Sequence, residues 1–309
     1  MKPPKHVFAT FPEFSRLTLS DREKWETLIA DYPPIYDISF PGLMTWWDQL
    51  GSMKVAQVNN NLVISYWLPG DDENNGLSLV GRSMIDESIC EIFDYLKSNG
   101  EEAKLVNVPE FVVQQIKFHD MFSIDETRRL NEYVLPLAHF YPLKNMVLHW
   151  RKRVKNYIDQ KLTVTSIDMA TKEGKTKLLK ALQWREKNHL NDFGVIEGEC
   201  MESFVSHADD LNIENLCVFL GEDLVGFCLY QVPTDKRYII MKHIKATDPA
   251  MFGFELIAYA LSKRFIEQGF QYVNLGADYD IERLRMFMVA IGAENFFRKY
   301  TITPKRSKR

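Results

Sequence analysis

The stretch from Asp223 to Thr303 constrains the fold more than any other part of this chain, because it reads as one continuous βαβαβ unit. Its pattern predicts strands at 223–232 and 237–246, a helix at 252–268, a strand at 272–275, a helix at 281–291 and a strand at 296–302. Gly269 follows the first of these helices, at a position where a left-handed residue commonly ends a helix. This order of elements is typical of α/β folds.

Composition and charge are typical of soluble globular proteins. Of the 309 residues, 46% are hydrophobic and 26% are charged, and the formal net charge is −4. No global field therefore draws the chain to nucleic acid or to an acidic membrane, and any such contact needs a local patch. No apolar run approaches the ~18 residues that span a bilayer, and the first residues lack the apolar core of a signal peptide. We therefore expect a cytoplasmic protein without a membrane-spanning segment.

The four cysteines predict neither a metal site nor a disulfide. Cys90, Cys200, Cys217 and Cys228 are scattered, with no Cys-x-x-Cys pair and no histidine at metal-like spacing nearby. Cys217 and Cys228 stand in apolar strand-like runs, where a small buried thiol is the ordinary interpretation. We expect no bound metal.

The order of elements divides the chain into two domains, residues 1–142 and 143–309. The first is predicted to hold a helix that ends before Pro33, helices at 40–50, 86–98 and 110–116, and strands at 53–59, 62–68, 77–80 and 104–108. The second adds helices at 145–160, 171–188 and 200–211 and a strand at 162–168 before the βαβαβ unit. No low-complexity linker separates the halves, so we expect them to share an interface.

Blocks along nearly the whole chain resemble a known family. They are Phe14-Ser-Arg-Leu-Thr-Leu19, Asp37-Ile-Ser-Phe40, Trp46-Trp47, Glu132-Tyr-Val134, Lys152-Arg153 with Tyr157, Lys245-Ala246, Asn274-Leu-Gly-Ala-Asp278, Ile281-Glu-Arg-Leu-Arg285 and Lys299-Tyr300. The chain resembles the bacterial family that includes the C-terminal catalytic domain of phosphatidylglycerol lysyltransferase and many proteins with no assigned reaction. The resemblance implies an α/β fold of two tandem acetyltransferase-like domains of the GCN5-related type, each a mixed sheet flanked by helices.

The lysyltransferase branch of that family uses an aminoacyl-tRNA as donor and a lipid head group as acceptor. This sequence departs from that branch because it shows no membrane-spanning half. The resemblance therefore implies group transfer without naming the group.

A polar cluster after the strand at 272–275 is the first candidate site. Asp278 and Asp280 follow the strand, and Arg283 and Arg285 lie in the first turn of the next helix. A carboxylate at this edge of an α/β sheet can orient an amine or act as a base. Alternatively, one aspartate caps the helix and pairs with an arginine. Arginines at an electropositive helix start favour a bound anion or a carboxylate partner.

The strand at 237–246 carries a second group of candidates. Alternation places His243 and Lys245 on one face and Lys242 on the other. His243 is a candidate general base, and the alternative is a hydrogen-bonded structural histidine. The family match gives Lys245 an ion pair or a phosphate contact.

Three further candidates for donor or substrate binding come from the matched blocks: Tyr133, Asn274 and Lys299. Tyr133 stands at the seam between the predicted domains, and seams of this kind commonly hold ligands. The alternative for Tyr133 is a packed side chain whose hydroxyl is satisfied by the protein.

The segment Thr247–Gly253 stands where an acetyltransferase carries its glycine-rich pyrophosphate loop. One glycine, an aspartate and a proline make a poor phosphate cradle. This composition weakens the case for coenzyme A and favours an aminoacyl-tRNA over an acyl-CoA as co-substrate.

A basic run on the predicted helix at 145–160 offers candidate nucleic-acid contacts: Arg151, Lys152, Arg153 and Lys155. The alternative is that the basic residues form a solvated helix face. The opposite face would then turn these apolar positions inward: Val147, Trp150, Val154, Tyr157 and Ile158.

Together these patterns predict acyl or aminoacyl transfer to an amine or hydroxyl, with a small molecule or a lipid head group as acceptor. Asp278 or His243 would serve as base or orienter, while Arg285 and Lys245 would hold a phosphate, a carboxylate or an oxyanion. The alternative is a non-catalytic binding module that keeps the fold and in which these residues pair with one another. DNA is not an expected partner, because no basic recognition helix stands in a helix-turn-helix pattern.

Overall fold

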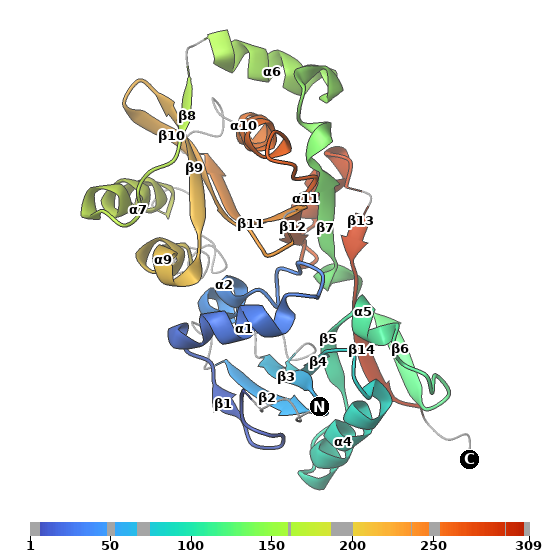
Figure 1. Ribbon diagram of the computed structural model, residues 1–309. Helices are drawn as coiled ribbons and strands as arrows, with labels where there is room; N and C mark the ends of the chain where they lie inside the picture. Colours follow the sequence, from blue (N-terminus) through green and yellow to red (C-terminus); the bar gives the residue numbers. More distant parts are fainter. Residues whose placement is uncertain are drawn as a thin grey trace.

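The chain folds around two seven-stranded mixed sheets flanked by helices (Figure 1), described here from a computed structural model. The structure describes residues 7–47, 53–66, 75–159, 162–186, 200–235, 237–246, 254–293 and 295–305. This architecture confirms the prediction of an α/β fold with two mixed sheets flanked by helices.

The first sheet has the strand order β1-β2-β3-β4-β5-β14-β6. Its strands are β1 (Ser15–Arg16), β2 (Lys54–Val58), β3 (Asn61–Tyr66), β4 (Gly76–Val80), β5 (Leu105–Pro109), β14 (Lys299–Pro304) and β6 (Phe122–Glu126). The turn between β2 and β3 places Asn59 and Asn60 in the left-handed region, with φ values of 48° and 65°.

The second sheet has the strand order β13-β7-β12-β11-β10-β9-β8. Its strands are β13 (Asn295–Phe297), β7 (Glu132–Pro136), β12 (Tyr272–Ala277), β11 (Tyr238–Ala246), β10 (Asp223–Gln231), β9 (Glu214–Leu220) and β8 (Thr163–Thr165). Only β11 and β12 pair in parallel among the described strands of this sheet, and the other neighbours are antiparallel.

Helices cover the sheets and fill the space between them. They are α1 (Arg22–Ile29), α2 (Phe40–Gly42), α4 (Ile85–Ser98), α5 (Glu110–Val113), α6 (Leu148–Asp159), α7 (Lys172–Glu186), α9 (Ala208–Leu211), α10 (Phe254–Ile266) and α11 (Glu282–Ala290). A π-helical turn follows α2 at Leu43–Trp47, and short 3₁₀ turns lie at Leu19–Asp21, Arg128–Leu130, Leu137–His139 and Leu143–Asn145. Figure 1 shows α1 and α2 between the two sheets.

Local sequence accounts for the start of α7. The Thr171 hydroxyl accepts a hydrogen bond of 3.0 Å from the Gly174 backbone N–H, so Thr171 is the N-cap of this helix. The helix positions Leu178, which is fully buried.

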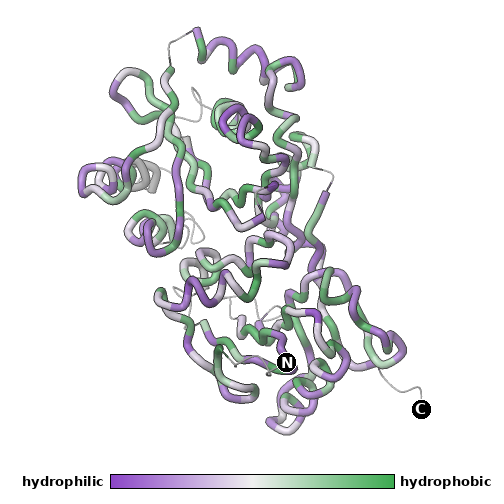
Figure 2. Tube along the Cα trace, in the orientation of Figure 1, coloured by the Kyte–Doolittle hydropathy of each residue, from purple (hydrophilic) through white to green (hydrophobic). Residues whose placement is uncertain are grey.

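The apolar residues form two clusters, and the larger one joins both sheets. It contains Trp25 and Phe40 from the first half together with Phe204 and Leu229 from the second. Figure 2 shows apolar residues concentrated along the strands and on the helix faces that meet them. The halves therefore share an interface, as their missing linker predicted. None of the four cysteines forms a disulfide.

Two strands cross the predicted division of the chain. β7 precedes residue 143 but pairs with β12 and β13, while β14 lies near the end of the chain and pairs with β5 and β6. The domain boundary between residues 142 and 143 stays a prediction. The two sheets do not coincide with it, because β7 belongs to the second sheet and β14 to the first.

The single strand expected at 296–302 is wrong, because β13 and β14 are separate strands in different sheets. The chain leaves the second sheet at Arg298, and the Lys299 backbone N–H then donates to Asn131 Oδ1 at 2.9 Å. This contact joins residues far apart in the sequence, so a local sequence pattern could not predict it. The sequence pattern also did not predict a strand at the position of β6.

Candidate functional site

A cavity opens where β11 and β12 separate. Their parallel pairing covers only Tyr238–Ile240 against Tyr272–Asn274, although β11 continues to Ala246 and β12 to Ala277. The cavity has an empty volume of about 900 Å³, and its lining includes residues of β11, β12, α10 and α11. It lies at the carboxyl ends of two parallel strands, which is where open α/β sheets bind ligands.

A β-bulge in β11 changes which side chains reach this cavity. Leu229 of β10 lies opposite His243, and Tyr230 lies opposite Met241, so Lys242 is the extra residue. The bulge interrupts the alternation that placed Lys242 on the other face from its neighbours. The cavity lining accordingly includes Lys242, His243 and Lys245. His243 is buried, and its ring packs edge-on against Phe204 at 5.3 Å.

The Lys242 ammonium lies in a nearly dry environment. The side chain is 5% exposed, its Nζ is 3.9 Å from the centre of the Tyr36 ring, and it donates to Ser39 Oγ at 2.5 Å. Burial lowers the pKa of Lys242 to about 7, although the charges of Glu132 and Asp37 act in the opposite direction. A substantial fraction of Lys242 is therefore an uncharged amine near neutral pH.

Asp278 lies at the end of β12 and is held by two arginines. Its side chain is fully buried, with Arg128 Nη1 at 3.2 Å and Arg285 Nε and Nη2 each at 3.1 Å. The Tyr133 hydroxyl donates to Asp278 Oδ2, and Asp280 also pairs with Arg285. The pKa of Asp278 is lowered, because these hydrogen bonds outweigh the raising effect of burial. Asp278 is therefore an ionised carboxylate with little tendency to take up a proton.

The turn after β12 places this aspartate. Gly276 has a φ of 76°, and Tyr279 and Asp280 follow with φ values of 49° and 60°. Two adjacent left-handed residues that are not glycine cost about 1–3 kcal/mol each. The Tyr279 N–H donates to the Arg129 carbonyl oxygen at 3.0 Å, which ties the turn to the segment before β7.

Some predicted residues stand together in this cluster and some do not. The structure brings together Tyr133, Asp278, Asp280 and Arg285, and it leaves Arg283 exposed on α11. Arg128, which also contacts Asp278, was not among the residues predicted from the sequence. The signal available was its position four residues before Glu132, at the edge of a matched block.

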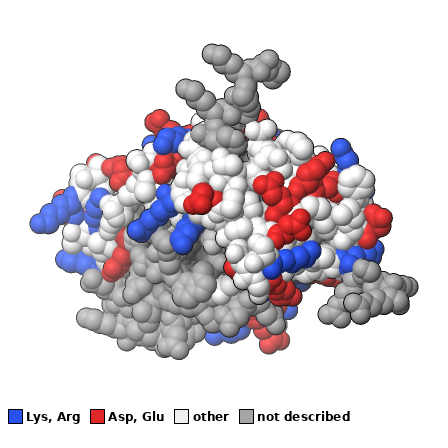
Figure 3. Space-filling model, turned by 90° about the horizontal axis from the view of Figure 1, so that it is seen from below, with Lys and Arg blue, Asp and Glu red and all other residues white. Residues whose placement is uncertain are grey.

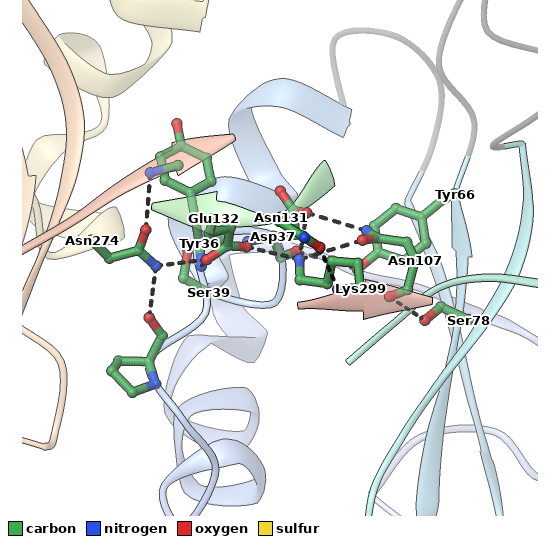
Figure 4. Close-up of polar contacts among 12 residues, drawn as sticks. Tyr36, Asp37, Ser39, Tyr66, Ser78, Asn107, Asn131, Glu132, Asn274 and Lys299 are labelled. Carbon is green, nitrogen blue, oxygen red and sulfur yellow. Dashed lines mark hydrogen bonds and ion pairs between the residues drawn. The ribbon is translucent and has the colours of Figure 1, made fainter. Parts of the chain in front are cut away.

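A buried polar network joins the two sheets (Figure 4). The Lys299 ammonium, fully buried, lies 2.7 Å from Asp37 Oδ2, 2.8 Å from Glu132 Oε1 and 3.3 Å from Asn107 Oδ1. Glu132 Oε2 accepts from Asn274 Nδ2 at 2.6 Å. The predicted residues Asn274 and Lys299 therefore belong to this network.

The network also fixes the segment beneath Lys242. Glu132 accepts hydrogen bonds from the backbone N–H groups of Tyr36 at 2.7 Å and Asp37 at 3.2 Å. These bonds hold Tyr36 and Ser39 against the Lys242 side chain. Asp37 and Glu132 lie in blocks that carry the resemblance, but neither was a predicted site residue.

The basic residues of α6 divide into two kinds. Arg153 pairs with Glu255 at 2.6 Å, and Arg151 donates to the carbonyl oxygens of Lys144 and Met146 at 3.0 Å. Lys152 and Lys155 are exposed.

The inward face predicted for α6 is partly wrong. Val154 and Tyr157 are buried, but Val147 and Ile158 are each 47% exposed. The helix begins only at Leu148, so Val147 is not part of its inward stripe.

Charges elsewhere on the molecule are mixed in sign. Figure 3 shows basic and acidic side chains in small groups on one face, among uncharged atoms. Over the described ranges, no group of three or more His, Cys, Asp and Glu side chains is placed to hold a metal ion. Within the same ranges, no helix is long and apolar enough to cross a membrane. The segment Thr247–Gly253, whose composition predicted a poor phosphate cradle, lies outside the described residues.

No protein-family model matches the sequence, and no curated protein matches it. Solved structures do match. A conserved protein of unknown function from Bacteroides thetaiotaomicron has a TM-score of 0.76 at 17% identity, with 94% of this chain and 99% of that chain covered. The C-terminal domain of an Agrobacterium fabrum protein named as a lysylphosphatidylglycerol synthetase has a TM-score of 0.64 at 12% identity, with coverage of 94% and 93%.

L-PGS from Bacillus licheniformis has a TM-score of 0.59 at 12% identity, with 94% of this chain and 93% of that chain covered. At identities this low, the likeness shows the fold. The resemblance predicted from the sequence is confirmed at that level, over nearly the whole chain.

Proposed function

We propose that the protein is a transferase that moves an acyl or aminoacyl group from an activated donor to an amine or hydroxyl acceptor. The observation that carries this proposal is the cavity between β11 and β12, where a buried lysine with a pKa of about 7 stands beside a histidine. The shared fold with a protein named for lysylphosphatidylglycerol synthesis supports the same class of reaction.

In the proposed reaction, the acceptor nitrogen or oxygen attacks the carbonyl carbon of the donor. A carbon–nitrogen or carbon–oxygen bond forms, and the ester or thioester bond to the carrier breaks. The acceptor loses one proton, and the leaving oxygen or sulfur gains one. A neutral Lys242 amine or the His243 imidazole can accept the first proton, since both side chains line the cavity and Lys242 has a pKa of about 7.

The remaining candidates have binding and positioning roles in this proposal. Lys245 lines the same cavity and would contact a phosphate or carboxylate of the donor. Asp278 would orient Arg285 and Tyr133 instead of removing a proton, because its pKa is lowered and its oxygens are already engaged.

We propose an aminoacyl-tRNA as the donor ahead of an acyl-CoA, and a small molecule or a lipid head group as the acceptor. The exposed Lys152 and Lys155 of α6 would contact tRNA phosphates. Arg151 and Arg153 contribute less, because protein groups already occupy their guanidinium groups.

The direct test offers the purified protein a pool of tRNA charged with labelled amino acids and, in parallel, a set of acyl-CoA thioesters. Loss of label from the tRNA, or release of free thiol, is followed with amines and glycerol-based head groups as acceptors. Lys242→Met and His243→Ala should each slow the transfer at least about tenfold. Lys54→Met, which changes an exposed lysine of β2, should not slow it. Unchanged rates in both cavity variants would refute the catalytic assignment.

Binding to tRNA is a separate prediction. Affinity should fall steeply with salt, and the double variant Lys152→Glu and Lys155→Glu should flatten the log–log slope by about one unit for each lost phosphate contact. The matched control is the double variant Lys172→Glu and Lys180→Glu, which reverses the charge of two exposed lysines of α7. Equal effects of the two double variants would show only a general charge effect.

The second candidate function is a binding module without catalysis. It is favoured by the Asp278 cluster, whose members satisfy one another: Arg128, Tyr133, Asp280 and Arg285. This function predicts saturable donor binding with no bond cleavage, and the same labelled-tRNA experiment distinguishes the two.

A further inference from the structure

A second cavity lies between α1 and the end of β10, away from the Asp278 cluster. Its empty volume is about 780 Å³, and its walls come from α1, the chain that follows α1, and the connection between β10 and β11. Most of the wall is apolar, with Ile29, Pro34 and Val232 among its members. The mostly apolar lining suits the body of a small organic molecule.

Two polar side chains in this wall have acceptor oxygens that no protein donor reaches. Gln231 is 4% exposed, and its Oε1 is buried without a hydrogen-bond partner. Oε1 of Glu26, on α1, is likewise buried without a partner. Buried polar atoms are nearly always hydrogen-bonded, and an unmet acceptor is destabilising. The cavity therefore presents two hydrogen-bond acceptors, and a ligand with N–H or O–H donors would satisfy them.

The charges around the cavity point to a cation. Its lining includes two carboxylates, Glu26 and Asp235, and no lysine, arginine or histidine among the described lining residues. Asp235 is already held by Arg237 at 2.7 and 3.0 Å. Arg22, the basic neighbour of Glu26 on α1, donates to the carbonyl oxygens of Asp209 and Asp210. Glu26 Oε1 therefore stays available to a ligand, while burial raises the pKa of this carboxyl and the nearby Arg22 charge lowers it.

We propose that this cavity binds a small organic ammonium compound, a primary amine carried on an apolar body. Glu26 accepts one N–H and supplies the opposite charge, Gln231 accepts another N–H, and the apolar body packs against Ile29, Pro34 and Val232. An anionic ligand of the same shape is excluded, because it would meet a carboxylate and unmet acceptors. The site is independent of the proposed transfer reaction, and it needs no activity to be measured.

Calorimetric titration of the full chain with hexylammonium, 1-hexanol and hexanoate tests the proposal. Hexylammonium should bind at least about tenfold more tightly than hexanol, and hexanoate should not bind. Glu26→Gln should weaken hexylammonium binding about tenfold or more. Glu23→Gln, which removes the same charge from an exposed position on the same helix, should leave the affinity unchanged.

A second variant guards against a folding defect. Gln231→Leu removes the unmet acceptor in a side chain of similar size, so it should raise the melting temperature while weakening hexylammonium binding several-fold. Leu284→Ala, in the wall of the other cavity, should keep the affinity. Equal binding of amine and alcohol, or full affinity in both Glu26→Gln and Gln231→Leu, would overturn the proposal. Loss of binding in Leu284→Ala alone would place the amine in the other cavity and would overturn it as well.

Discussion

Lys299 and Lys242 are both buried lysines near Asp37 and Glu132, yet their pKa values move in opposite directions. Burial lowers the pKa of each, but direct ion pairs with Asp37 and Glu132 reverse the effect for Lys299. Lys242 instead meets a hydroxyl and an aromatic ring, so burial prevails. One lysine is therefore a fixed charge, and the other changes its charge near neutral pH.

Lys299 and Asn274 were predictable as site residues from the sequence, but their binding partners were not. The partners of the Lys299 ammonium, Asp37 and Glu132, lie 262 and 167 positions away along the chain. Spacing rules act within one element, whereas this site is assembled from three distant segments. The Lys242 site was hidden for a related reason, because a bulge is set by pairing with β10 and leaves no signal in the β11 sequence.

The first residue-scale prediction concerns pH. The folded state holds the Lys242 proton less tightly than the unfolded state does, so unfolding takes up a proton between about pH 7 and pH 10.5. The free energy of unfolding therefore rises with pH between about 7 and 10.5, and it falls again as the pH is lowered toward 7. Between pH 7 and about pH 9, the native protein should gain roughly 2 kcal/mol relative to Lys242→Met, measured by urea unfolding at both pH values. A constant difference between the two proteins would show that Lys242 does not titrate in this range.

The second residue-scale prediction concerns the buried ion cluster. Lys299→Met leaves the carboxylates of Asp37 and Glu132 buried without their cation, so it should cost about 3–5 kcal/mol of unfolding free energy. Lys97→Met breaks an exposed pair with Asp94 at 4.0 Å and should cost less than about 1 kcal/mol. Urea unfolding of both variants measures the contrast. Similar losses in the two variants would contradict the role given to Lys299.

At the scale of elements, most predicted helices and strands lie within a few residues of the observed ones. The helix predicted at 252–268 is α10, Phe254–Ile266, and the strand at 237–246 is β11, Tyr238–Ala246. The errors lie where tertiary contacts prevail over local pattern. β13 and β14 are separated because Arg298 and Lys299 are drawn toward the first sheet, where the Glu110 N–H donates to the Arg298 carbonyl oxygen at 3.0 Å.

The element-scale prediction tests β14 as a structural strand of the first sheet. Ile302 is fully buried, so Ile302→Ala should destabilise the protein by about 2–5 kcal/mol. Thr303, its half-buried neighbour, points to the other side of the strand, and Thr303→Ala should cost less than about 1 kcal/mol. Thermal and urea unfolding measure both. A small effect of Ile302→Ala would mean that β14 contributes little to the sheet.

At the scale of the whole molecule, the two sheets behave as parts of one core. The larger apolar cluster takes residues from both halves, the Lys299 network links the sheets, and β7 and β14 cross between them. Figure 1 shows α1 and α2 in the space between the sheets. Glu26 and Ile29 of α1 line one cavity, and Tyr36, between α1 and α2, lines the other.

The whole-molecule prediction is a single unfolding transition. Because the core is shared, calorimetry should give one peak whose enthalpy agrees with the van't Hoff enthalpy. Circular dichroism and intrinsic fluorescence should report the same midpoint. Two resolved transitions, or probe-dependent midpoints, would show that the halves unfold independently.

The position of β14 also sets the order in which the protein can be completed during synthesis. The first sheet needs β14 between β5 and β6, yet the ribosome adds roughly 170 residues after β6 before it reaches Lys299. At about 5–20 residues per second, that delay is on the order of ten seconds or more. The nascent first half therefore waits with an unpaired strand edge, the kind of surface that chaperones protect. The first sheet can be completed only after residues 299–304 have been synthesised.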